Sequence, residues 1–191
     1  MERIEFVAPL QVRWRVAEEP TPHGAGLRPR VYLDTSIPSY LVGRLNPNRE
    51  IERRQRITDT WWRRHRHHSA IFISDEVKEE AKAGNEELAA QRLTLLEGIE
   101  SLHPSSRSEE IASALIELGA LPPKAKIDAK HIAIAAAHSM HYLLTWNCRH
   151  MANPFNAHRI VQTCEMLGFR SPKICTPEVL MRIYRHERPN P

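Results

Sequence analysis

The stretch VYLDTS, residues 31–36, decides the fold. Its first three residues form a short apolar run, which predicts a buried strand, and Asp34 follows where such a strand leaves the core. A carboxylate beside a core element raises the free energy of the folded state unless a positive group meets it. Asp34 is therefore interpreted as a ligand for a cation, with the cap of a following helix as the structural alternative.

Two later stretches also set a polar group beside an apolar run. In KIDAKHIAIAAA, residues 126–137, Asp128 opens a helical stripe whose face is too apolar and too small-sided to belong to solvent. The alternative role for Asp128 is compensation of the helix dipole in the first turn. The apolar run at residues 142–144 predicts another short strand, and Asn147 comes shortly after its end.

A third carboxylate lies in the stretch VKEEAKAG, residues 77–84. Glu80 is the candidate there, and the alternative is that this glutamate, like its neighbours Glu76 and Glu79, is a surface charge. Because Glu80 follows a predicted strand at residues 71–73 by about two helical turns, its side chain can lean over the end of that strand.

Short apolar runs alternate with helical patterns along the chain. This alternation predicts an α/β fold in which a parallel sheet is covered by helices on both faces. Ligands of such sheets bind at the carboxyl ends of the strands, near the point where the strand order reverses. Asp34 and Asn147 are therefore expected to meet there. The strands are predicted at residues 31–33, 71–73, 142–144 and 173–175.

Four motifs in one order resemble the PIN-domain nucleases: a strand followed by Asp-Thr-Ser, then Ser-x-x-Val-x-x-Glu, then Asp-Ala-x-His-x-Ala-x-Ala, and then Thr-x-Asn closing a strand. The chain looks most similar to the VapC-type toxins of toxin–antitoxin pairs, over about residues 30–179. The resemblance implies a three-layer α/β/α PIN-like domain with a short central parallel sheet, at residues 30–185. Residues 1–29 are expected to be a poorly structured N-terminal extension, and residues 186–191 a flexible tail.

The resemblance also implies an activity and partners. It implies a Mg²⁺-dependent endoribonuclease, with Asp34, Glu80 and Asp128 as catalytic residues and metal ligands and Asn147 as a weaker ligand. An all-oxygen ligand set independently favours Mg²⁺, or Mn²⁺. Many PIN domains carry Asp at the position of Asn147, so this chain departs from the family there, and one-metal and two-metal sites both stay open. A small antitoxin protein and a homodimer are the implied partners.

Two hydroxyl groups near the predicted edge are candidates for substrate binding. The resemblance suggests that Ser36 positions the metal or the scissile phosphate, with capping of the next helix as the alternative. Thr145 would hydrogen-bond a water or a phosphate, and the alternative is a structural threonine at a strand end. His131, one turn from Asp128, is expected to pack or to support a ligand rather than to contact the substrate.

Positive charge is concentrated in residues 49–66, where seven arginines face three acidic residues. This excess of four equals the formal net charge of the whole chain, +4. Such a cluster attracts phosphate backbones, and the alternative is a solvated helix face with internal ion pairs. The candidates for substrate binding are Arg63, Arg64 and Arg66, next to Trp61 and Trp62, of which one is expected in the core and the other on a partner surface.

Composition bounds these hypotheses. The 191 residues suit one domain with an appendage, no apolar run approaches a membrane span, and no basic-then-apolar leader opens the chain. Three cysteines at uneven spacing form no disulfide framework, so we expect a cytoplasmic protein. A zinc site of Cys148, His150, His158 and Cys164 is disfavoured because the spacing lacks paired ligands. The alternative to an enzyme is a degenerate PIN module that binds RNA or a protein partner without cleavage, which Asn147 keeps open.

Overall fold

The structure is a computed structural model that describes residues 28–187. It contains a five-stranded parallel sheet in the order β3-β2-β1-β4-β5. The strands are β1 (Arg30–Leu33), β2 (Ala70–Ser74), β3 (Glu100–Leu102), β4 (Tyr142–Leu144) and β5 (Lys173–Cys175). The predicted extension at residues 1–29 and tail at 186–191 lie mostly outside the described residues and stay predictions.

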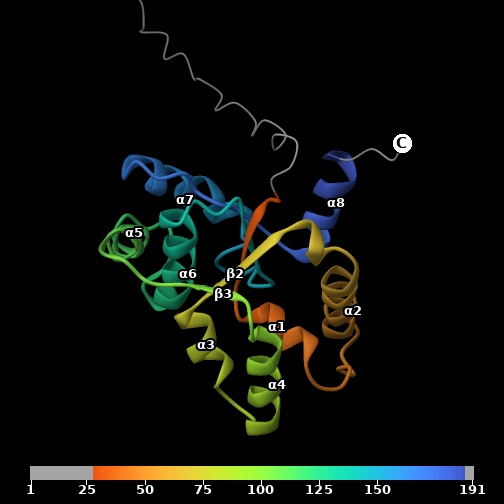
Figure 1. The fold of residues 1–191 in the computed structure, drawn as a ribbon. Helices are drawn as coiled ribbons and strands as arrows, with labels where there is room; N and C mark the ends of the chain where they lie inside the picture. Colours follow the sequence, from red (N-terminus) through yellow and green to blue (C-terminus); the bar gives the residue numbers. More distant parts are fainter. Residues whose placement is uncertain (1–27, 188–191) are drawn as a thin grey trace, which may run out of the picture.

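Helices cover both faces of this sheet (Figure 1). They are α1 (Ser36–Leu41), α2 (Arg49–Arg64), α3 (Asp75–Ala81), α4 (Glu86–Leu96), α5 (Ser106–Glu117), α6 (Lys126–Ala137), α7 (Pro154–Met166) and α8 (Pro177–Glu187), with short 3-10 helices η1 (Arg66–His68) and η2 (Pro123–Ala125). On one face α5 packs against α6 and α7, and on the other α2 packs against α1 and α8. The three-layer α/β/α arrangement predicted from the sequence is confirmed.

The two central strands form the middle of the core. All residues of β4, and all of β1 after Arg30, are buried, as continuous apolar runs in a parallel sheet require. Tyr32 pairs with Leu143, which pairs in turn with Ile174 of β5. Helix α6 lies across one face, and its predicted apolar stripe is buried from Ile132 through Ala136.

Local capping explains where two of the helices begin. Asn48 caps α2 because its side chain accepts hydrogen bonds from the backbone N–H groups of Glu50 and Ile51. Ser74 caps α3 by accepting from the N–H of Val77, although the same residue ends β2. The switch from strand to helix therefore occurs within a single residue, which fixes where the first turn of α3 stands over the end of the sheet.

One strand was not predicted from the sequence. Glu100–Leu102 follows α4 (Glu86–Leu96) and forms the edge strand β3, paired with β2. A three-residue strand with a glutamate and a serine offers no apolar run, so its pairing depends on the neighbouring strand. Across the described residues, no helix combines the length and the hydropathy needed to cross a membrane.

Candidate active site at the carboxyl edge of the sheet

The strand order reverses between β1 and β4, and both strands end at the same edge. From β1 the chain proceeds to β2 and β3 on one side, whereas β4 and β5 lie on the other. Asp34 follows β1 directly, Thr145 follows β4 directly, and the Asp34 N–H donates to the carbonyl of Leu144 at 3.2 Å. The predicted meeting of these two strand ends is confirmed, at the place where open α/β sheets bind ligands.

The Asp34 carboxylate is 5% exposed and is held by neutral donors. Its Oδ1 accepts the N–H and the hydroxyl of Ser36, at 3.1 and 2.5 Å, and its Oδ2 accepts the Thr145 hydroxyl at 2.8 Å. Burial raises the pKa of Asp34, although the charge of His131 and these hydrogen bonds oppose the shift. The fold thus holds a carboxyl group where ionisation is costly.

Glu80 reaches the same edge from α3. Its Oε2 accepts the Thr35 hydroxyl at 2.5 Å and lies 2.8 Å from Nε2 of His131. His131 is buried, and its Nδ1 lies 2.7 Å from the hydroxyl of Tyr32. Burial by itself raises the pKa of Glu80, but together the hydrogen bonds of His131 and Thr35 have a larger effect in the opposite direction. The pKa of Glu80 therefore lies below its ordinary value. The expected supporting role of His131 is confirmed by these contacts.

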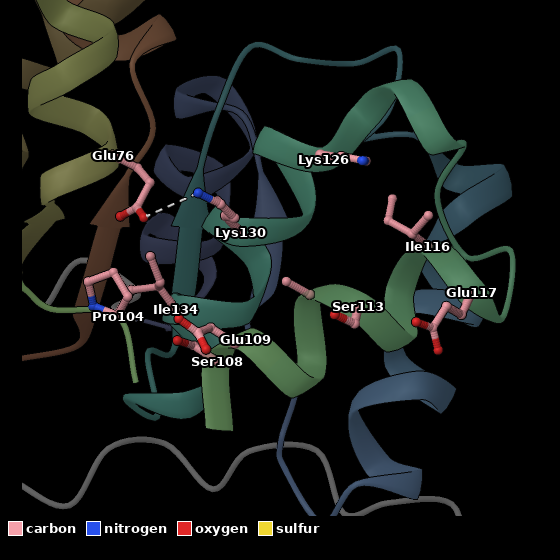
Figure 2. Close-up of a pocket in the computed structure, with 11 residues that line it drawn as sticks. Glu76, Pro104, Ser108, Glu109, Ser113, Ile116, Glu117, Lys126, Lys130 and Ile134 are labelled. Atoms are coloured by element: carbon pink, nitrogen blue, oxygen red, sulfur yellow. Dashed lines mark ion pairs between the residues drawn. The ribbon is translucent and has the colours of Figure 1, made fainter. Parts of the chain in front are cut away.

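The neighbouring glutamates of Glu80 point elsewhere. Glu79 is exposed and pairs with Lys82 at 2.6 Å. Glu76 lies 3.9 Å from Lys130 and lines a pocket of about 540 Å³ beside α5 and α6, shown in Figure 2. Among the three candidates, therefore, only Glu80 contacts the residues around Asp34.

Asp128 is held by two residues of the loop after β4. Its Oδ1 accepts the side-chain amide of Asn147 at 2.9 Å, and its Oδ2 lies 2.7 Å from Nδ1 of His150. The side-chain oxygen of Asn147, Oδ1, accepts the backbone N–H of His150 at 3.1 Å, so one lone pair of Oδ1 remains. Asn147 therefore orients Asp128, besides its predicted role as a weaker metal ligand.

His150 was not predicted as a site residue. In the sequence it was a candidate only within a disfavoured zinc set, whereas the structure places it against Asp128, with both side chains 17% exposed. It lies in a loop between β4 and α7, where neither periodicity nor a motif marks it. Its only signal is a position three residues after Asn147, because the loop brings its backbone N–H onto that side chain.

Thr145 connects the two halves of the site. Its hydroxyl donates to Asp34 and accepts the backbone N–H of Asn147 at 2.8 Å, and Asn147 in turn donates to Asp128. Because Thr145 is fully buried and both functions of its hydroxyl are used, its predicted contact with a substrate is corrected to a positioning role. The hydroxyl of Ser36 is similarly used, since it donates to Asp34 and accepts the N–H of Trp146.

The predicted substrate-binding arginines are not at this edge. Arg63 and Arg64 end α2, and Arg66 lies in η1, just before β2 begins at Ala70. Ala70 pairs with Arg30, the first residue of β1, so these side chains belong to the amino end of the strands. The arginines and the three carboxylates therefore lie at opposite ends of the strands.

The donor set suits a hard cation. Asp34, Glu80 and Asp128 offer oxygens, and within the described part of the chain no lysine or arginine forms an ion pair with any of them. Their negative charge is met only by imidazoles, hydroxyls and amides, so a divalent ion fits the chemistry of the set. Among the described residues, 28–187, no group of three or more His, Cys, Asp or Glu side chains is already arranged to hold a metal ion.

Replacing Thr145 by Val is expected to destabilise the folded protein by about 1–3 kcal/mol, because Asp34 loses a donor and the N–H of Asn147 loses its acceptor. The free energy of unfolding, measured with a chemical denaturant, tests this. The matched control is Thr60→Val on the exposed side of α2, where a change within about 0.5 kcal/mol is expected. Equal effects of the two substitutions would contradict the positioning role.

No protein-family model matches the chain, and no curated protein matches it. Among solved structures, the chain is similar to VapC20 of Mycobacterium tuberculosis, a toxin that cleaves the sarcin-ricin loop, with 15% identity and a TM-score of 0.47 over 65% of this chain and 95% of that one. It is also similar to VapBC2 from Rickettsia felis, bound to a DNA fragment from its promoter, with 16% identity and a TM-score of 0.43 over 77% of this chain and 98% of that one.

Proposed function

We propose that this chain is a metal-dependent endoribonuclease of the VapC-type PIN class, which hydrolyses RNA phosphodiester bonds as the toxin of a toxin–antitoxin pair. The observation that carries the proposal is the position of Asp34, Glu80 and Asp128 at one edge of the sheet: Glu80 contacts the loop after β1, Asp128 contacts the loop after β4, and Asp34 joins the two loops. Each of these carboxylates belongs to a motif by which the sequence resembles PIN-domain nucleases.

The proposed roles follow from how each carboxylate is held. Asp34 is the most deeply buried of the three, and Ser36 and Thr145 fix both of its oxygens, so it is the group best suited to receive a cation in one position. Glu80 stays ionised because hydrogen bonds lower its pKa, and it adds a second fixed negative charge. Asp128 is half-buried and faces the loop after β4, where it completes the set from the opposite side.

Mg²⁺ is the proposed cofactor, with Mn²⁺ as a substitute, and the ligands would be Asp34, Glu80 and Asp128 with Asn147 as a weaker one. Such an ion would supply a Lewis acid for the phosphodiester and would make a bound water lose its proton more easily. The residues of this chain contribute the fixed carboxylate oxygens, and the amide of Asn147 contributes no charge of its own. A site with three carboxylates therefore favours one tightly held ion over two.

Cleavage of a labelled RNA by the purified chain tests the proposal. Activity is expected with Mg²⁺ or Mn²⁺, loss of activity with a chelator, and a loss of at least about a hundredfold in Asp128→Asn, which removes a ligand charge. The matched control is Glu165→Gln on α7, an exposed carboxylate that forms no ion pair within the described residues and contacts none of the site residues. Cleavage that survives both the chelator and Asp128→Asn would come from a contaminant and would remove the proposal.

A small antitoxin protein and a homodimer are part of the proposal by resemblance alone, and a cytoplasmic location is proposed from the spacing of the cysteines. A purification of the native complex in which no small protein accompanies the chain would count against the antitoxin. The second candidate function is a PIN module that binds RNA or a protein without cleaving, which the neutral Asn147 favours because it lowers the charge of the site. RNA binding without any metal-dependent cleavage would establish that alternative.

A further inference from the structure

The arginines of α2 divide into a paired and an unpaired group. Four of them form ion pairs with acidic side chains: Arg53 with Glu50 and Glu178, Arg54 with Glu50, Arg56 with Glu52, and Arg63 with Asp59. Arg49, at the start of the helix, Arg64, at its end, and Arg66, in η1, form no ion pair with any side chain that the structure describes. The predicted alternative, a solvated helix face with internal ion pairs, therefore describes the four paired arginines. It does not describe Arg64 and Arg66, which lie at the amino end of the sheet.

Two of the unpaired arginines, Arg64 and Arg66, lie near the end of α8. Arg64, Arg66 and Arg185 are exposed, and we call these three residues the amino-end cluster. Three histidines lie in the segment between α2 and β2, and the rings of two of them, His67 and His68, lie 4.0 Å apart. The His68 ring also lies 6.4 Å from the ring of Tyr184, the residue before Arg185, so η1 and α8 are in contact.

The local electrostatics show how closely the cations gather. Burial lowers the pKa of His65, and the charges of His67, Arg185 and Arg64 lower it further. Within the described part of the chain no acidic side chain pairs with any member of the cluster. Uncompensated like charges raise the free energy of the folded state, so such a cluster is more easily explained by a polyanion that binds it than by stability.

A recess beside the cluster has the chemistry of a base-binding site. It measures about 400 Å³ and is lined by Leu41, Asp59, Trp62, Arg63, Arg66 and Leu95. The guanidinium carbon of Arg66 lies 4.4 Å from the centre of a Trp62 ring. Indole and guanidinium planes stack on unpaired bases, which favours single-stranded RNA over an acidic protein or a lipid surface.

We propose that the amino-end cluster and the Trp62 recess form a second RNA-binding site, which holds the strand at a distance from the bond that is cleaved. This inference rests on the proposed function and adds a requirement for substrate length. The cluster and the carboxylates lie at opposite ends of the strands, of which the longest, β2, has five residues at about 3.3 Å each and spans about 17 Å. A stacked strand at about 3.4 Å per nucleotide would need about five nucleotides to reach both.

RNA binding in the presence of a chelator tests the site without cleavage. The variant is Arg64→Gln/Arg66→Gln/Arg185→Gln, and the control, with the same change of net charge, is Arg56→Gln/Arg107→Gln/Arg170→Gln at exposed positions elsewhere. For a 20-nucleotide single strand, the cluster variant is expected to bind about tenfold more weakly, and the slope of log K against log salt to fall by about 2, or about 0.7 for each arginine. The control is expected to stay within about twofold.

Two results would overturn the proposal. Equal losses in the variant and the control would show that only net charge matters. A cluster variant that keeps its RNA affinity and loses affinity for polyglutamate would assign the cluster to an acidic protein instead.

Cleavage kinetics then test the length requirement. With the 20-nucleotide RNA, the cluster variant is expected to show a KM raised about tenfold and an unchanged kcat, because the cluster binds the strand away from the reacting phosphate. With a four-nucleotide RNA, the wild type and the variant are expected to have the same KM. A rise in KM for both RNAs would place the cluster at the cleavage site and contradict the proposal. If no RNA is cleaved by any form, the nuclease proposal fails, whereas the binding result still decides this one.

Discussion

Replacing Asp34 by Asn is expected to abolish RNA cleavage and, at the same time, to raise the stability of the folded protein. The loss of activity should be at least about a hundredfold, because the amide removes the most deeply buried negative charge of the site. The gain in stability, about 0.5–2 kcal/mol, is expected because folding no longer has to hold an ionised carboxylate away from water. A purely structural Asp34 would give the opposite change in stability.

The pH dependence of that gain follows from the direction of the pKa shift. Burial raises the pKa of Asp34 above 3.8, its ordinary value, so folding favours the protonated carboxyl. The contribution of Asp34 to stability is therefore complete below pH 3.8 and is lost as the pH rises through the raised pKa. The difference in unfolding free energy between Asp34→Asn and the wild type should grow over that interval and stay constant above it.

Asp75→Asn is the matched control, because this carboxylate also lies near the carboxyl edge and has the opposite shift. A hydrogen bond from His103 lowers the pKa of Asp75 against the effect of burial, and Asp75 begins α3, where a negative charge is favourable. Its substitution is expected to lower stability by a few tenths to about 1 kcal/mol and to leave cleavage intact. Urea denaturation between pH 4 and 8, together with an RNA cleavage assay, measures both variants.

Replacing Leu143 by Ala is expected to have the largest effect on stability, a loss of about 2–5 kcal/mol. Leu143 is fully buried at the centre of β4, with Tyr32 beside it on one strand and Ile174 on the other. Truncation removes apolar contacts and leaves a cavity between the sheet and the helices, where neither neighbouring strand can close in. The free energy of unfolding from denaturant titration tests this.

Phe155→Ala is the control for Leu143→Ala, since it removes an even larger side chain from a position that is 90% exposed. A change within about 0.5 kcal/mol is expected there. Comparable losses for the two variants would mean that the middle of the core does not lie at β4.

The sequence predicted the parts of this fold that have a local signal. Three of the five strands, β1, β2 and β4, contain short apolar runs, and Asp34 and Asp128 were found because a carboxylate beside an apolar run is unusual. The strand β3 has no such run, because it lies at the edge of the sheet and takes its register from β2. Its pairing is a tertiary effect that no window of sequence contains.

The candidate site was predicted for its carboxylates and missed for the residues that hold them. His150 contacts Asp128 only because the loop after β4 folds back, and Thr145 positions two groups only because β1 and β4 are neighbours. The position of Arg63, Arg64 and Arg66 at the far end of the sheet was likewise invisible, because charge composition contains no information about which strand end a helix terminus reaches. The sequence therefore identified the carboxylates of the site, but it did not identify the residues that contact them.

The hydrogen bond from Thr145 to Asp34 joins residues 111 positions apart. A chain still being synthesised has made Asp34 long before the ribosome reaches Thr145, so its acidic edge stays incomplete until most of the protein exists. If the protein cuts RNA, this order of assembly keeps the growing chain harmless to the ribosome and message that are producing it.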